Sequence, residues 1–169
     1  MKPSGPIPII SIIGRSGSGK TTLLEKIIPE LKRRGYRVGT IKHHAHPGIE
    51  IDQPGKDTWR HAHAGSDHVV IAAPDRIVSI RNLSHELELE EISLQMVDVD
   101  IILTEGFSRA SIPKIEVIRA DRSVEPLEVT ERIAFATDID LLNPEPQFNL
   151  DDAYGLVDMI ENRYLKKNS

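Results

Sequence analysis

The sequence predicts an α/β fold with a mostly parallel central β-sheet, flanking helices and one antiparallel hairpin. Short apolar segments rich in β-branched residues alternate along the chain with longer segments whose apolar residues recur at helical spacing. Residues 7–13 (IPIISII) are apolar almost throughout, which is typical of a strand buried on both faces of a parallel sheet. Pro74 and Asp75 separate two short β-like segments, and this pattern predicts the hairpin.

The first half of the chain is expected to begin with a strand over residues 7–13 and a helix over residues 20–34. Pro29 should bend or weaken this helix, and Gly35 should end it. Asp57 is expected near the start of a second, short helix. The further segments expected in this half are a strand over 36–41, the short helix over 57–64, and hairpin strands over 68–73 and 76–80.

In the second half, a helix is expected to begin at Ser84, with Ser84 or Asn82 as its N-cap, and to include Met96. Asn149 is expected to cap a C-terminal helix that ends near Leu165. Strands are expected over residues 99–104, 114–119 and 132–137. Because no linker or repeat interrupts this order, we expect a single domain over residues 1–169.

The composition limits the classes of function. Hydrophobic residues make up 39% of the chain and charged residues 28%, as in ordinary globular proteins. The net charge of -5 argues against a large nucleic-acid or anionic membrane surface. The chain has no cysteine, which excludes disulfides and thiol-ligated metals, and we see no signal peptide or membrane span. We expect a cytoplasmic protein without nucleic-acid or membrane partners.

Residues 14–21 (GRSGSGKT) match the phosphate-binding pattern G-x-x-x-x-G-K-[ST], known as Walker A. The glycines allow positive φ angles and a close approach to the ligand, so that successive N–H groups point at phosphate oxygens. An apolar strand before the motif and an amphipathic helix after it predict a P-loop NTPase-type, nucleotide-binding domain. The residues expected to bind the triphosphate are Gly14, Arg15, Ser16, Gly17, Ser18, Gly19, Lys20, Thr21 and Thr22.

A nucleotide site of this kind also needs Mg²⁺ ligands. The Thr21 hydroxyl is the ligand that the motif supplies. Glu105 follows the apolar strand ending in IILT, so it is expected at the carboxyl edge of the sheet, where ligands of α/β proteins bind. Lys20 is expected to reach the β- and γ-phosphates.

Four segments together resemble one family: GRSGSGKTTL, TIKHHAHPGIEIDQPGKDTWRHAHAG, ILTEGF and PKIEVIR. This is the molybdopterin-guanine dinucleotide biosynthesis protein B family, and the resemblance covers about residues 9–138. It implies a GTP- and Mg²⁺-binding adaptor in molybdenum-cofactor biosynthesis, usually a homodimer, with weak or partner-dependent GTP hydrolysis. It also implies a partner, the guanylyltransferase that joins GMP to molybdopterin, and possible contact with molybdopterin itself.

The resemblance extends the set of expected site residues. Asp52 would lie in a switch-like segment near the γ-phosphate and share the metal with Thr21 and Glu105. Lys20, Asp52 and Glu105 would then be the residues that support hydrolysis. Lys114 would line the same region.

The sequence motifs do not decide whether the nucleotide is GTP or ATP. Many GTPases read guanine with an [NT]-K-x-D tetrapeptide, which this chain lacks. Asp138 follows a late strand and is the candidate to read the base. The expectation of GTP therefore rests on the resemblance.

The histidine-rich segment over residues 40–68 admits three interpretations. It could form a transition-metal site from His43, His46 and Asp52, with His61 or His63 as a further ligand. It could be a switch loop that brings Lys42, His43 and His46 to phosphate or to an anionic pterin, which its place after a strand favours. It could also be a solvated polar loop without a specific role.

Two other functions fit parts of the sequence. The phosphate motif is also found in small-molecule kinases, although no arginine-rich lid is evident here. A metallochaperone GTPase would use the histidines as metal ligands.

Overall fold

The computed structural model describes residues 6–166 and groups the chain into two compact units. The first, here the sheet unit, comprises Met1–His44 and Leu89–Ser169, and the second, the hairpin unit, comprises Ala45–Glu88. Whether they unfold together as one domain stays a prediction.

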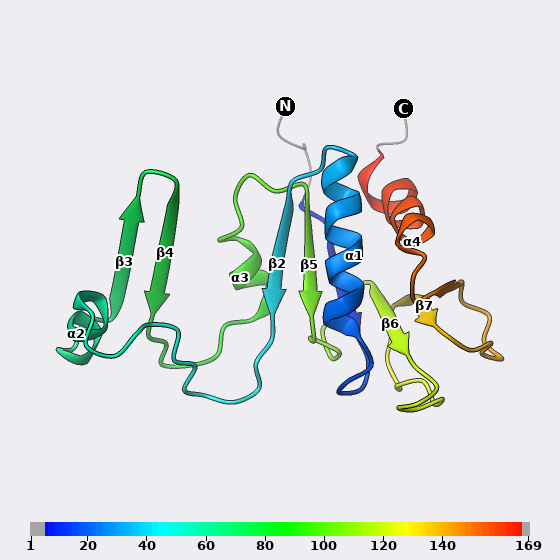
Figure 1. Cartoon of the computed structure of the whole chain (residues 1–169), viewed down its shortest axis with the longest axis horizontal. Helices are drawn as coiled ribbons and strands as arrows, with labels where there is room; N and C mark the ends of the chain where they lie inside the picture. The colour runs from blue at the N-terminus through cyan, green and yellow to red at the C-terminus, as the bar shows by residue number, and fades with distance from the viewer. Residues whose placement is uncertain (1–5, 167–169) are drawn as a thin grey trace. The chain divides into compact units, whose positions relative to one another are not determined.

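The sheet unit contains a six-stranded sheet in the order β2-β5-β1-β6-β7-β8, and every neighbouring pair is parallel. The carboxyl ends of its strands therefore lie along one edge, as the arrowheads of β2, β5 and β6 show in Figure 1. The strands are β1 (Ile9–Ile13), β2 (Val38–Lys42), β5 (Ile101–Glu105), β6 (Lys114–Ile118), β7 (Arg132–Thr137) and β8 (Gln147–Asn149). The α/β class with a parallel sheet is confirmed.

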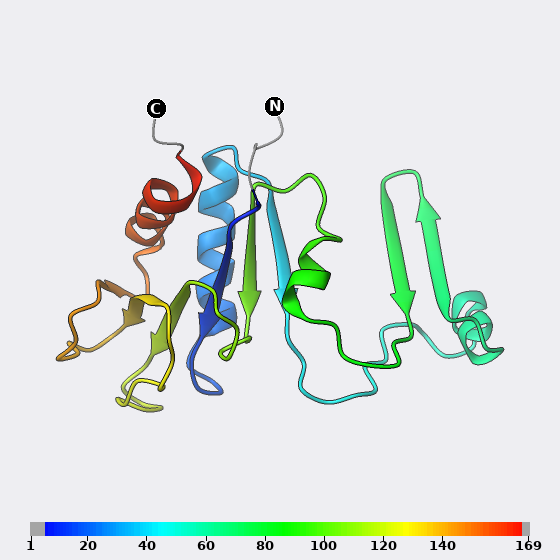
Figure 2. The ribbon, with the colours of Figure 1, turned by 180° about the vertical axis from the view of Figure 1, so that it is seen from behind.

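Helix α1 (Lys20–Arg33) packs beside α4 (Ala153–Ile160), which continues as the π-helix η1 (Glu161–Leu165). Figure 1 shows α1 and α4 in front of the sheet, and Figure 2 shows the strands from the opposite side. Their apolar faces and the strands form one core because each element must bury its hydrophobic face. Fully buried members of this core include Ile10, Ile12, Ile27, Leu31, Leu103, Ile115 and Leu156. Within residues 6–166, none of the helices is long and apolar enough to cross a bilayer.

Strand β6 is buried along its whole length although charged and apolar residues alternate in its sequence. Glu116 forms an ion pair with Arg132 of β7 at 2.9 Å, and their side chains are 2% and 9% exposed. The backbone N–H of Leu127 also donates to Glu116 at 2.8 Å. Burial raises the pKa of Glu116, while these two contacts oppose the rise. The alternation therefore reflects paired internal charges and not a solvent-facing side.

The hairpin unit contains α2 (Asp57–His63), β3 (His68–Ala73) and β4 (Arg76–Arg81). The two strands pair antiparallel, with Ala73 opposite Arg76 at the turn, so the predicted hairpin is confirmed. Val69 is buried, but several apolar side chains of the hairpin stay at the surface of this unit. These exposed side chains are Val70 (51%), Ile71 (40%), Ile77 (73%) and Val78 (38%).

The helix expected from Ser84 is much shorter in the structure. Helix α3 spans Leu89–Ser93, so Asn82 and Ser84 do not cap it. Leu89 is 2% exposed and packs with Ile102 of the sheet, whereas residues 84–86 are exposed. The helix therefore begins where the chain re-enters the sheet unit, because burial and not local propensity decides its start.

The sequence predicted the C-terminal end of α1 correctly but not the N-terminal cap of α4. Gly35 has a φ of 91° and ends α1, with the Tyr36 N–H donating to the Leu31 carbonyl, as expected of a left-handed C-terminal cap. The helix is continuous through Pro29. The expected cap of the last helix was wrong: Asp152 and not Asn149 accepts the hydrogen bond, from the Gly155 N–H at 2.8 Å.

Asn149 has a different position because it ends a short strand that the sequence analysis missed. Strand β8 spans only Gln147–Asn149 and pairs with β7. The Asn149 side chain accepts a hydrogen bond from the Asp151 N–H within the following turn. A strand of this length lacks a period long enough to recognise in a sequence.

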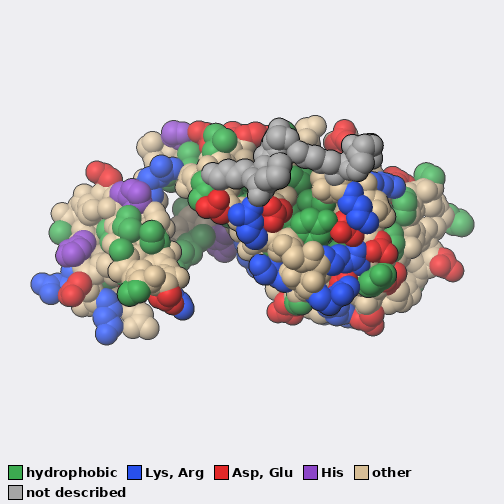
Figure 3. Space-filling view, turned by 90° about the horizontal axis from the view of Figure 1, so that it is seen from above, with side chains coloured by type: hydrophobic (Ala, Val, Ile, Leu, Met, Phe, Trp, Pro, Cys, Tyr) green, Lys and Arg blue, Asp and Glu red, His purple; other side chains and the backbone are tan. Residues whose placement is uncertain are grey.

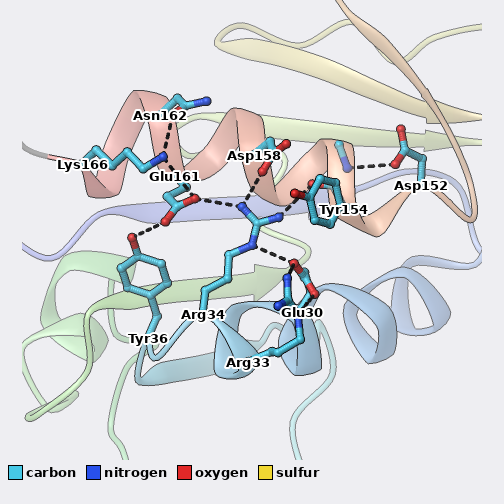
Figure 4. Close-up of polar contacts among 11 residues, drawn as sticks. Glu30, Arg33, Arg34, Tyr36, Asp152, Tyr154, Asp158, Glu161, Asn162 and Lys166 are labelled. Carbon is cyan, nitrogen blue, oxygen red and sulfur yellow. Dashed lines mark hydrogen bonds and ion pairs between the residues drawn. The ribbon is translucent and has the colours of Figure 1, made fainter.

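Arg34, directly after α1, joins this helix to α4 and η1 (Figure 4). Its guanidinium contacts Glu30 at 2.7 Å, Asp158 at 2.5 Å and Glu161 at 2.8 Å. It also lies over the Tyr154 ring, 4.7 Å from the ring centroid. A single cation thus holds together three carboxylates that would otherwise repel one another.

We expect Arg34→Ala to lower the free energy of unfolding by about 2 kcal/mol, because it leaves these half-buried carboxylates without their shared partner. Arg33→Ala is the matched control, since Arg33 also pairs with Glu30 but its side chain is 63% exposed. The control should lower the stability much less, because ion pairs of exposed side chains contribute little. Urea unfolding measures both, and equal losses would contradict the bridging role of Arg34.

The contact of Glu30 with Arg33 and Arg34 makes the stability of the fold pH-dependent. Hydrogen bonds from Arg33 and then Arg34 lower the pKa of Glu30 from 4.5 to about 2. A carboxylate with a depressed pKa stabilises the fold above its ordinary pKa, and this stability is lost as the pH falls toward the folded-state value. Glu30→Gln should therefore be less stable than the wild type near neutral pH, and the difference should shrink at about pH 3. Urea unfolding at both pH values is the measurement; a pH-independent difference would refute it.

Candidate functional site

The glycine loop, residues 14–19, connects β1 to the N-terminus of α1. Gly14, Gly17 and Gly19 have φ angles of 142°, 75° and 97°, as the phosphate motif predicts. At Gly14 a methyl group would lie 2.5 Å from the Val117 carbonyl oxygen, so any larger residue would displace β6 or the loop. The loop therefore depends on glycine for its own packing as well as for its open N–H groups.

Lys20 begins α1 and spans the glycine loop. Its ammonium donates to the carbonyl oxygens of Gly14 and Arg15, both at 3.0 Å. This places a positive charge across the loop, beside the N-terminus of α1, where an anion is stabilised. Ser16, Gly17 and Thr22 are exposed around it, while the Ser18 side chain is buried.

Thr21 and Glu105 meet at the carboxyl edge of the sheet. The Thr21 hydroxyl donates to Glu105 at 3.0 Å, although the two residues are far apart in the sequence. The ammonium of Lys42, at the end of β2, lies 3.4 Å from the other Glu105 oxygen. The pairing register of β5 with its two neighbours brings these side chains together, because Glu105 is opposite Ile12 of β1 on one side and Lys42 of β2 on the other. A hydroxyl and a carboxylate beside a phosphate loop are oxygen ligands suited to Mg²⁺.

His43 follows β2 at the same edge. Its backbone N–H donates to the Glu105 carbonyl at 3.0 Å, and its ring lies 4.9 Å from the Phe107 ring. A methyl group at Gly106 would approach the His43 Cβ to 3.0 Å, so glycine permits this packing. His43 is therefore next to Glu105, and contact with a ligand stays a prediction.

Asp52 and His46 belong to the hairpin unit. The Asp52 carboxylate accepts a hydrogen bond from the Gln53 N–H at 2.8 Å, and its other oxygen is buried. In residues 6–166, no three His, Asp or Glu side chains are grouped so that they could hold a metal ion. The roles of Asp52 in metal binding and hydrolysis stay predictions.

Lys114 has a different environment from the one that the resemblance implied. Its side chain is completely buried, and its ammonium donates to the carbonyls of Ala110, Ile112 and Thr130 at 2.6, 3.0 and 3.0 Å. Burial lowers the pKa of this ammonium. Lys114, which lies opposite Ser11, thus holds together the segments that enter β6 and β7, and a role for it in the nucleotide region stays a prediction.

Asp138 also has a structural contact. It follows β7, and its carboxylate accepts a hydrogen bond from the Ala120 N–H at 2.8 Å. It thereby holds the segment after β6, residues 119–123, which we call the arginine loop. The side chain is exposed, and whether Asp138 reads a base stays a prediction.

The arginine loop brings two residues to the site that the sequence analysis missed. A methyl group at Gly19 would lie 3.2 Å from Nη2 of Arg119, and one at Gly17 would lie 3.4 Å from Nε of Arg122. Both guanidinium groups therefore lie against the glycine loop. The sequence signal was partial: Arg119 ends a predicted strand, and carboxyl ends of parallel strands share an edge, but only the observed strand order puts this end next to the glycine loop.

Comparisons with known proteins agree with this arrangement. The profile of the MobB family, described as molybdopterin guanine dinucleotide synthesis protein B, matches residues 9–138. The molybdopterin-guanine dinucleotide biosynthesis adapter protein of Haemophilus influenzae is 38% identical over 92% of this chain and 89% of its own length. The adapter protein of Escherichia coli is 36% identical over 96% of each chain.

Solved structures support the same assignment. The crystal structure of Bacillus subtilis MobB superposes with a TM-score of 0.77, at 28% identity, over 95% of this chain and 99% of that chain. The predicted P-loop NTPase fold is thereby confirmed. On the profile match and the identity to relatives of nearly the same length, this chain belongs to the MobB family, molybdopterin guanine dinucleotide synthesis protein B.

Proposed function

We propose that this protein is a cytoplasmic adapter in molybdopterin guanine dinucleotide biosynthesis that binds GTP with Mg²⁺. The observation that carries the nucleotide part is the contact of Thr21 with Glu105 beside the glycine loop and Lys20. The adapter part is supported by the names of relatives that match nearly the whole chain.

Each residue of the site has a defined task in this proposal. The N–H groups of the glycine loop and the Lys20 ammonium would bind the β- and γ-phosphates. Thr21 and Glu105 would hold the Mg²⁺ ion or its water shell, and bound Mg²⁺ would neutralise charge on the phosphates. Lys42 balances the Glu105 charge at 3.4 Å. Lys20 and Glu105 would support a weak GTP hydrolysis that a partner stimulates, and Asp52 is the further residue that the family resemblance implies for this step.

The partner would be the guanylyltransferase that attaches GMP to molybdopterin, and molybdopterin itself is a candidate ligand. His43 would face such an anionic ligand, because it follows β2 next to Glu105. The preference for GTP over ATP rests on membership of the family, with Asp138 as the candidate base contact.

A homodimer is the remaining part of the proposal, and the hairpin supports it. Four apolar side chains of β3 and β4 are exposed, namely Val70, Ile71, Ile77 and Val78. Figure 3 shows hydrophobic side chains reaching the surface of this unit among charged ones. Val70 and Ile77 lie on one face of the hairpin, and Ile71 and Val78 lie on the other. Exposed apolar strands of this kind are typical of an interface, because they otherwise favour uncontrolled association.

The first test is a thermal-shift panel with GTP, GDP, ATP and ADP, each with and without Mg²⁺. A ligand that binds the native state raises the melting temperature. We expect the largest shift with GTP and Mg²⁺, no shift for Lys20→Ala, and a smaller Mg²⁺ dependence for Glu105→Gln.

Two results would contradict the proposal. Stabilisation by ATP without stabilisation by GTP would remove the assigned nucleotide. Failure to associate with the guanylyltransferase, together with no effect on guanylylation of the cofactor, would remove the adapter role.

The second test concerns the dimer. Ile77→Asp should shift the protein from dimer to monomer in sedimentation velocity, because it places a charge in the proposed apolar interface. Leu142→Asp is the control: this side chain is exposed like that of Ile77, but it lies in the sheet unit after β7. A wild-type monomer, or a dimer that Ile77→Asp leaves intact, would disprove this interface.

A further inference from the structure

The arginine loop carries two cations that the proposed function has not used. Arg119 and Arg122 approach Gly19 and Gly17 at the distances given above, from the loop that follows β6. The loop is itself ordered by hydrogen bonds: the N–H groups of Arg122 and Ser123 donate to the Arg119 carbonyl at 2.9 and 3.1 Å. Together with the contact from Asp138, these bonds hold both arginines in place.

Arg119 has unused hydrogen-bonding capacity. Its Nε is buried and has no hydrogen-bond partner. The hydrogen bond from Lys26, at 2.5 Å, is the main cause that lowers the pKa of Asp151, and the charge of Arg119 adds to it. The Asp151 carboxylate therefore already has Lys26 as its partner. A buried guanidinium N–H without a partner is costly unless a ligand or water completes it. The small cavity that Arg119 borders, about 10 Å³, accepts no more than one water.

The position of the arginines relative to the metal ligands indicates which part of a nucleotide they meet. Thr21 and Glu105 meet on the β5 side of β1, and in the proposed function they would hold Mg²⁺ beside the γ end of a triphosphate. The arginine loop lies on the β6 side, across the glycine loop. A triphosphate with its γ end at Glu105 would have its α-phosphate and ribose on the side of Arg119 and Arg122.

We propose that Arg119 and Arg122 bind the α-phosphate and ribose end of the nucleotide. Guanidinium groups suit this task, because their planar arrangement of donors matches phosphate oxygens. Asp138, besides its proposed contact with the base, would also position the loop, since it accepts a hydrogen bond from the Ala120 N–H. This inference rests on the proposed nucleotide binding and adds contacts that GTP and GDP share.

Isothermal titration calorimetry with Mg²⁺–GTP and Mg²⁺–GDP tests the assignment. Arg119→Gln should weaken both nucleotides by similar factors of roughly 10-fold, the typical effect of losing a charged hydrogen bond. Arg122→Gln, at an exposed position, should weaken both by a smaller but equal factor. Arg119→Lys should recover part of the affinity, because it keeps the charge and loses the planar fork.

Arg33→Gln is the control, because Arg33 is an exposed arginine at the opposite end of α1, about 20 Å from Lys20 by helical rise. Unchanged affinity of both arginine-loop variants would overturn the inference. A loss confined to GTP would also overturn it, since that result would place the arginines at the γ-phosphate. If the wild type binds neither nucleotide, the proposed function itself fails. Should Arg119→Gln not fold, Arg122→Gln decides the question alone.

Discussion

The parallel pairing of β1 with β5 on one side and β6 on the other is the constraint on which the site depends. Parallel strands end at the same edge, so the glycine loop after β1 lies between Glu105 and the arginine loop. This pairing is sheltered from water, because Ile10 and Ile12 of β1 are completely buried. The geometry of the site is thus a consequence of how the core is built, and a residue that shifts β1 would move all its parts together.

The charges inside the sheet unit fall into two groups with different consequences. Lys114 and Glu116 are buried in β6 and have all-protein partners, so they fix the segments around the strand. Thr21, Glu105 and Lys42 lie at the rim, where the same kinds of groups can exchange partners with a ligand. The charged residues of the proposed site therefore lie at the carboxyl edge, while those within the strands stabilise the fold.

The sequence predicted more of the fold than of the site. Continuous apolar runs and helical periodicity placed the core strands and α1 within a few residues, since both signals are local. The start of α3 and the cap of α4 were wrong, because Leu89 and Asp152 are chosen by contacts between distant segments. Lys114 was assigned to the site by family resemblance, and only the structure shows that three carbonyls surround its ammonium.

The phosphate loop could be predicted from GRSGSGKT alone, because this one local stretch combines the required glycines, lysine and hydroxyl. Which distant residues surround that loop became visible only in the folded chain. Glu105 accepts a hydrogen bond from the Thr21 hydroxyl at the edge of the sheet where both residues were expected. Lys42 pairs with Glu105, and the Arg119 guanidinium lies against Gly19 from the loop after β6, on the other side of β1. The physical reason is that strand order and register bring these side chains together, and neither is encoded in any single segment.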